Sequence, residues 1–179
     1  MEDHRLIQGC LLGSEEDFRR LMHKYTGKAM AMAINLLGNR EDAEDACQDT
    51  FIRIHNHLES FDFSRNFKDW MYAILHNRCM DLLRKRTRFR KYFVRQSGEI
   101  RENPDEGLTP PPKAKKLPGE FLHRLSPKER TALVLWANES YSSEEIASVL
   151  RCSASTARVF LYKARKKIKK YLEEENAMV

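Results

Sequence analysis

The chain has 179 residues, of which 41% are hydrophobic and 32% charged, and its formal net charge is +6. This composition is ordinary for a globular protein, and the length suits one domain or two small ones. No run approaches eighteen apolar residues, and the first residues (MEDHRLIQG) lack the pattern of a signal peptide, so we expect no membrane insertion and a cytoplasmic location.

The charge is unevenly distributed along the chain. Residues 1–60 carry 7 Lys or Arg against 11 Asp or Glu, residues 61–119 carry 14 against 7, and residues 120–179 carry 11 against 8. An acidic first third followed by basic segments predicts two kinds of partner, with contact to a polyanion confined to the later segments.

Four cysteines are scattered through helical patterns, which favours reduced thiols over disulfides. His76 and Cys79 have the spacing of a metal-ligand pair, but no second pair completes a tetrahedral site. We therefore predict no metal and no cofactor.

Three apolar stripes with helical spacing occupy the first half of the chain. The first ends at Gly38-Asn39, a helix-stop signal, and the second and third fall in residues 41–57 and 67–88. The stripes predict three antiparallel helices in a small bundle. Their members are Phe18, Leu21, Met22, Tyr25, Ala29, Met32, Ala33, Leu36 and Leu37; Ala43, Cys47, Thr50, Phe51, Ile54 and Leu58; and Phe67, Trp70, Met71, Ile74, Leu75, Arg78 and Leu82.

Residues 96–118 hold five of the six prolines and no apolar stripe, which is typical of an extended and partly stiff linker. A helix start follows, in which Ser126 is the N-cap, Pro127 the first helical residue and Glu129 the third. The fold predicted is therefore all-α, with two small helical domains, 1–95 and 119–179, joined by a flexible linker.

The most informative stretch is 142–170, which predicts a helix, a tight turn and a second, cationic helix. Ser142 and Glu145 have the spacing of a capping box, and Ser153 is a good N-cap after the break at Arg151-Cys152. In the second helix an inward stripe of Ala157, Leu161, Ala164 and Ile168 leaves the cations outward. Two such helices form the layout that places a recognition helix in the DNA major groove.

Two helices of the first half also carry partner signals. Helix 41–57 presents acids, of which Asp49 lies two turns in, beyond the reach of the helix dipole, so a contact with a basic partner surface explains it better. Helix 67–88 begins aromatic and ends cationic, a combination that suits stacking on unpaired bases and contact with phosphates. There Trp70 falls in the core stripe, whereas Tyr72 falls off it and is expected to be exposed.

The order of these features resembles the extracytoplasmic-function (ECF) group of bacterial sigma factors, a two-domain branch of the sigma-70 family. The resemblance rests on residues 42–53 (DAEDACQDTFIR), on 67–77 (FKDWMYAILHN) with Asp81 and Arg84, on 125–130 (LSPKER), and on the patterns within 142–150 and 156–165. Each motif alone is weak, but together and in order they are specific.

The resemblance implies that the chain is a sigma region 2 bundle followed by a helix-turn-helix region 4, and that it directs promoter-specific initiation without catalysis. The implied partners are RNA polymerase core, through the clamp helices of its largest subunit and its flap, promoter DNA, and an anti-sigma factor. The implied polymerase-binding residues are Asp45, Gln48, Asp49 and Arg53. Those for the −10 element and its flipped base are Phe63, Ser64, Arg65, Tyr72, Asn77, Asp81, Arg84, Lys85 and Arg88. Those for the −35 element are Ser155, Thr156, Arg158, Phe160, Tyr162, Lys163, Arg165 and Lys166.

Several alternatives stay open at the level of sequence. Asp81 could pair with Arg84 or Lys85 instead of serving a DNA-reading face, and Phe160 could contact a thymine methyl or pack against the first helix of the motif. Arg151 stands where the family often has glycine in the turn. At the level of function, the alternatives are an autonomous helix-turn-helix regulator with an N-terminal sensor domain and, less favoured, a helical hydrolase using His55 and His57.

Overall fold

The computed structural model describes residues 2–97, 121–122 and 124–176, and within these ranges the regular secondary structure is entirely helical. The predicted all-α fold is therefore confirmed. No helix in the described ranges is long and apolar enough to cross a membrane. The linker predicted at 96–118 lies, from residue 98 onward, outside the described residues.

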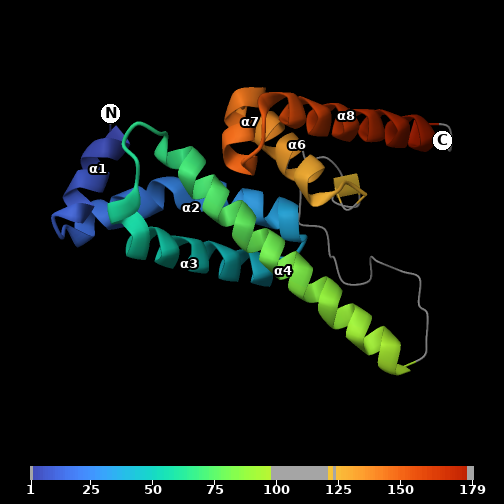
Figure 1. Ribbon diagram of the computed structural model, residues 1–179, viewed down its shortest axis with the longest axis horizontal. Helices are drawn as coiled ribbons and strands as arrows, with labels where there is room; N and C mark the ends of the chain where they lie inside the picture. The colour runs from blue at the N-terminus through green and yellow to red at the C-terminus, as the bar shows by residue number, and fades with distance from the viewer. Residues whose placement is uncertain (1, 98–120, 123, 177–179) are drawn as a thin grey trace.

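The N-terminal unit contains four α-helices (Figure 1). Helix α1 spans Glu2–Leu11, α2 Glu15–Leu37, α3 Arg40–His57 and α4 Phe67–Ser97, and a short 3-10 turn, η1, spans Leu58–Ser60. The Gly38-Asn39 stop is confirmed: Gly38 adopts φ 79° and its amide donates to the carbonyl of Ile34, while the Asn39 side chain accepts from Asp42 and starts α3. Helix α1 has no counterpart among the predicted stripes; it buries Leu6 and Ile7 against the bundle.

Helix α4 is longer than predicted. It continues from Arg88 to Ser97, two residues into the predicted linker, because the sequence offers neither glycine nor proline before Gly98. In Figure 1 its C-terminal part extends beyond the other helices of the bundle. The end of α4 therefore projects away from the core of the N-terminal unit.

The described part of the C-terminal unit contains α6 (Pro127–Glu139), α7 (Ser143–Leu150) and α8 (Ala154–Asn176). Both predicted capping boxes are present, at Ser126 with Glu129 and at Ser142 with Glu145. Arg151 ends α7 with φ 50°, the left-handed conformation that glycine more often supplies. Ser153 then accepts from the amide of Thr156, as predicted for the N-cap of α8.

The two units pack against each other, α7 on α4 and α6 on α2 (Figure 1). One cluster of buried side chains runs through both units, from Leu21 and Leu36 of α2 to Leu135 of α6 and Ile146 of α7. The predicted inward stripe of α8 is confirmed, because Ala157, Leu161 and Ala164 are buried and Ile168 is half-buried.

Candidate nucleic-acid interface

The outer face of α3 gathers the residues predicted to bind polymerase. Asp45, Gln48 and Arg53 are exposed and Asp49 is half-buried. Ile52, which the motif reasoning missed, lies on the same face with 58% of its surface exposed. The sequence does hint at this residue, because Ile52 is an apolar residue seven positions after Asp45 and so falls on the polar side of the helix. The face is thus an acidic surface with an apolar centre, a composition suited to a protein partner.

Ion pairs tie this helix to α4. Arg78 pairs with Asp49, and Arg86 pairs with Asp42 near the start of α3. Arg86 also donates to the carbonyl of Leu37, at the C-terminal end of α2, with 3.3 Å between nitrogen and oxygen. Asp49 therefore already has a cation beside it inside the molecule, which the local sequence pattern does not indicate.

The loop between η1 and α4 is held by its own hydrogen bonds and by aromatic packing. The Asp62 carboxylate accepts from the amide of Ser64 at 2.9 Å, and hydrogen bonds from the Ser64 hydroxyl and amide lower the pKa of Asp62. Phe61 is buried, with ring centroids 5.3 Å from Trp70 and 5.4 Å from Phe63, which is 37% exposed. His4 of α1 lies edge-on to Phe63 at 5.5 Å. The loop thus presents a partly open aromatic ring on a fixed backbone.

The predicted DNA-reading strip of α4 lies on its outer surface. Asn77, Asp81, Arg84, Lys85 and Arg88 are all exposed. Arg84 pairs with Asp81 at 3.0 Å, so the ion pair that the sequence allowed as an alternative role for Asp81 is present. An exposed pair of this kind is worth little in stability and leaves the Asn77 amide and the remaining cations available to DNA.

The expectation that Tyr72 is exposed is wrong for this conformation of the chain. Only 1% of its surface is accessible, because α7 and the segment that joins it to α6 cover that side of α4, and its ring lies 6.1 Å from that of Tyr141. The periodicity of α4 alone could not indicate this, since the covering residue lies sixty-nine positions later in the chain.

Helix α8 exposes most of the predicted −35 residues to solvent. Ser155, Arg158, Lys163, Arg165 and Lys166 are exposed, and Tyr162 is 66% exposed. Thr156 is half-buried, with its hydroxyl 2.8 Å from that of Ser153. Within the C-terminal unit Arg158 pairs with Glu144 at 3.3 Å, and Arg165 lies over the Trp136 ring at 5.0 Å.

Phe160 packs internally. It is half-buried against the main cluster of core side chains, and the Lys128 ammonium lies 5.8 Å from its ring centroid. The apolar residue that does lie on the outward face, between Arg158 and Tyr162, is Val159, which is 47% exposed. A small branched side chain at that position can contact a thymine methyl group, so Val159 is a reading candidate that the family pattern did not indicate.

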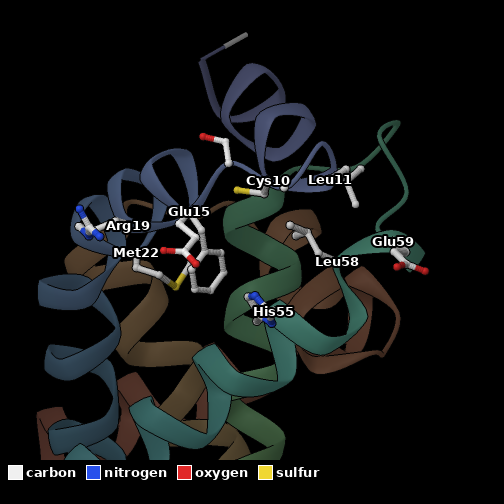
Figure 2. A pocket seen from close by; sticks show the side chains of 11 residues that line it. Cys10, Leu11, Glu15, Arg19, Met22, His55, Leu58 and Glu59 are labelled. Atoms are coloured by element: carbon white, nitrogen blue, oxygen red, sulfur yellow. The ribbon is translucent and has the colours of Figure 1, made fainter.

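A cavity of about 640 Å³ opens between α1, α2 and the end of α3 (Figure 2). Phe18, Met22 and Leu58 line it together with His55, whose ring lies 4.9 Å from that of Phe18. His57 is not among the lining residues, so the two histidines of the hydrolase hypothesis do not share the cavity. Among the described residues no cluster of His, Cys, Asp or Glu is arranged to hold a metal ion.

These surfaces define a class of protein: an all-helical DNA-binding transcription factor with a helix-turn-helix and a second basic helix. Comparison with known families narrows the class. Residues 21–89 match the model of Sigma-70 region 2, and residues 119–168 match that of Sigma-70 region 4. The chain belongs to the sigma-70 family of sigma factors, in its ECF group.

Characterised relatives span almost the whole chain. The ECF RNA polymerase sigma factor SigW of Bacillus subtilis is 25% identical over 175 residues, covering 90% of this chain and 92% of its own. The RNA polymerase sigma-H factor of Pseudomonas aeruginosa is 27% identical and covers 96% and 94%.

Solved structures agree with this assignment. CnrH, in complex with the cytosolic domain of CnrY, superposes with a TM-score of 0.72 at 26% identity, covering 97% of this chain and 99% of the other. RpoE of Bartonella quintana, in complex with the anti-sigma factor NepR, superposes with a TM-score of 0.69 at 25% identity, covering 88% and 98%.

Proposed function

We propose that this chain is an ECF-type sigma factor that binds RNA polymerase core and directs promoter-specific initiation by recognising −10 and −35 elements and assisting DNA opening. The observation that carries the proposal is the presence, in one chain, of two separate exposed cationic strips, on α4 and α8, and a third exposed face that is acidic and apolar, on α3. The matches to both sigma regions support the same function.

The role of α3 is contact with polymerase. Asp45 and Gln48 extend into solvent and flank Ile52, so a basic partner surface with an apolar contact point would bury all three. Arg53 stands at the edge of this face, where it can select the orientation of the partner through charge.

The role of the loop and α4 is capture of the −10 strand. Phe63, Ser64 and Arg65 lie on the exposed loop, next to the aromatic cluster around Phe61. Unstacking one base step costs a few kcal/mol, which stacking on an aromatic ring and contact of phosphates with Arg84, Lys85 and Arg88 can offset. No bond is made or broken by the chain in this step, so the proposed function requires no catalytic residue.

The role of α8 is readout of the −35 duplex in the major groove. Arg158, which is exposed, would contact base edges, whereas the exposed Lys163, Arg165 and Lys166 would contact phosphates. We further propose that an anti-sigma factor is a partner of this chain, as NepR is of RpoE in the solved complex from Bartonella quintana. Since polymerase and promoter DNA are cytoplasmic in bacteria, the chain is expected to act there.

The experiment that tests the function adds the purified chain to sigma-free core polymerase with a library of promoter fragments, and maps transcript starts. We expect transcript starts that depend on the chain and whose promoters share −10 and −35 sequences. The autonomous-regulator alternative predicts no starts together with tight footprints by the chain alone on paired half-sites. The names of the relatives favour the sigma factor over that alternative.

A further inference from the structure

Helix α1 touches the loop between η1 and α4 through one aromatic side chain. The imidazole of His4 lies edge-on to the Phe63 ring, with 5.5 Å between the ring centroids and 81° between the ring planes. The same imidazole lies 6.4 Å from the ring of Phe61. Edge-to-face contacts at such distances are favourable, because the positive edge of one ring meets the negative face of the other. In Figure 1 the N-terminal end of α1 accordingly lies beside the loop that leads into α4.

The start of α1 is itself fixed to α2. The hydroxyl of Tyr25, a residue only 4% exposed, donates to the carboxylate of Asp3 at 2.6 Å. The Lys24 ammonium lies 2.6 Å from Asp3 and 2.8 Å from Glu2. Burial opposes ionisation of Asp3, but hydrogen bonds from Lys24 and Tyr25 outweigh it and lower the pKa of this carboxyl. His4 is therefore held in place by the bonds of the residue before it.

The anchor on α2 and the loop belong to one cluster of packed rings. The Tyr25 ring lies 5.4 Å from that of Phe67, the first residue of α4, and the Phe67 ring lies 5.7 Å from that of Phe61. Phe61 and Phe67 are buried, so neighbours restrict their rings on all sides. Phe63 also contacts Phe61, with centroids 5.4 Å apart, but 37% of its surface is exposed. Phe63 is thus the ring of the loop that solvent, or a base, can reach.

The backbone of the loop does not by itself fix the orientation of this ring. Hydrogen bonds from the amides of Ser64 and Arg65 to Asp62 set the path of the chain. The rotamer of Phe63 is a separate degree of freedom, and an exposed side chain samples several staggered rotamers unless its neighbours exclude them. Stacking on a base is more favourable when the ring is ordered beforehand, because less side-chain entropy is then lost on binding.

We propose that His4 is a positioning residue for capture of the −10 strand: its imidazole holds the Phe63 ring in the orientation on which an unpaired base stacks. The inference rests on the proposed function. In this role His4 acts through Phe63 and touches no DNA itself. An aromatic ring at position 4 is therefore what matters, so phenylalanine should replace His4 and alanine should not.

The first test measures the Phe63 ring in the free, full-length chain. Three-bond NMR couplings from its Cγ to the backbone nitrogen and carbonyl carbon report the populations of its rotamers. We expect His4→Ala to raise the ratio of minor to major rotamers about twofold to tenfold, the factor that an aromatic pair contributes. His4→Phe should restore the parent populations. His23→Ala, which removes an exposed histidine from α2, is the matched control and should change nothing.

The second test measures strand capture by core polymerase loaded with the full chain. The DNA is a fork whose −10 element is single-stranded. His4→Ala should weaken binding to this fork about twofold to tenfold, and His4→Phe should restore it. In a Phe63→Ala background, adding His4→Ala should have no further effect, because the two residues act as one unit. A general loss of structure, or direct contact of His4 with DNA, would instead weaken binding in both backgrounds.

The outcomes separate this inference from the proposed function. If Phe63 keeps the parent rotamers in the His4→Ala variant, His4 does not position the ring, and the inference is overturned whatever the DNA binding shows. If the rotamers change but the parent complex has no preference for −10 sequences, the positioning of the ring stands and the proposed function fails. If the parent captures the −10 strand and His4→Ala captures it equally well, the inference is overturned while the proposed function stands.

Discussion

The guanidinium of Arg78 on α4 pairs with the carboxylate of Asp49 on α3, so the acid expected to meet polymerase also joins two helices of its own bundle. Asp45, one turn earlier, lies exposed on the same helix. The two acids should therefore respond differently to the same substitution. A change at Asp49 would remove an internal ion pair, whereas a change at Asp45 would alter only the surface.

Asp45→Lys is expected to weaken binding to core polymerase about tenfold, the effect of reversing one charge at an interface, with little change in melting temperature. Asp49→Lys should weaken polymerase binding and also lower the melting temperature, since a lysine would face Arg78. Competition binding and thermal unfolding of both variants check this. Unchanged polymerase affinity in both would remove α3 from the docking surface.

Arg158→Ala should reduce initiation at promoters with a good −35 element about tenfold, within the 1–3 kcal/mol that a base contact contributes. Its partner in the free chain, Glu144, gives the control: Glu144→Gln removes the pair without removing the cation. In vitro transcription on matched templates with and without the −35 element measures the effect. An identical loss on both templates would indicate phosphate contact rather than base readout.

Phe160→Ala is expected to lower the free energy of unfolding by about 1–2 kcal/mol, since the ring is half-buried in the core. Tyr162→Ala, which removes an exposed ring two positions later, should stay within about 0.5 kcal/mol of the parent but weaken binding to −35 duplex DNA. Denaturant unfolding and duplex binding of the two variants distinguish packing from reading. A stable Phe160→Ala protein with altered promoter preference would contradict the assignment.

Acidification should open the contact between the units. Burial, with Lys128 and Arg84 nearby, lowers the pKa of His76 to about 4, and its Nδ1 lies 3.0 Å from the Thr131 hydroxyl of α6. Because that hydroxyl donates to the carbonyl of Pro127, the neutral ring must donate through Nδ1–H. A lowered pKa means that the open chain binds a proton at higher pH than the closed one, so closure weakens as pH falls below about 6.5.

Between pH 7.5 and 5.5, the difference between the pKa of His76 in the closed and in the open chain corresponds to about a tenfold shift of the equilibrium toward the open state. Small-angle X-ray scattering at the two pH values measures it, and His76→Gln, which cannot titrate, should show a much smaller change. An equal response of the parent and this variant would assign the pH dependence to groups other than His76.

Local signals predicted most of the helices and the residues that start and end them. The capping boxes at Ser126 and Ser142 and the stop at Gly38 each depend on residues within a few positions, so the sequence alone identifies them. Burial of Tyr72 depends instead on Tyr141, and the link of Asp69 to Tyr141 spans 72 positions. No periodicity reports such contacts, and this is why the interface between the units escaped prediction.

The surface residues also divide into those that the sequence alone indicates and those that only the structure reveals. The family motifs indicated Asp45 and Arg158, which the structure leaves exposed, but Ile52 and Val159 became candidates only once their exposure was known. An apolar residue on a helix is expected in the core by default, so its functional meaning depends on which face the fold leaves open. Arg151 shows the converse, since its left-handed backbone is set by the turn between α7 and α8 rather than by its own preference.

The ends of α4 and of the C-terminal unit impose a limit on length. Twenty-three residues separate Ser97 from Phe121, and a fully extended chain of that length spans at most about 80 Å. That contour length is close to the distance between the −10 and −35 elements, which is about 85 Å for a separation of about 25 base pairs. The dimensions of the two units extend the reach of the chain further. In a chain that reads both promoter elements as proposed, the number of residues after Ser97, rather than the affinity of either unit for DNA, would therefore set the longest promoter spacer that one molecule can bridge.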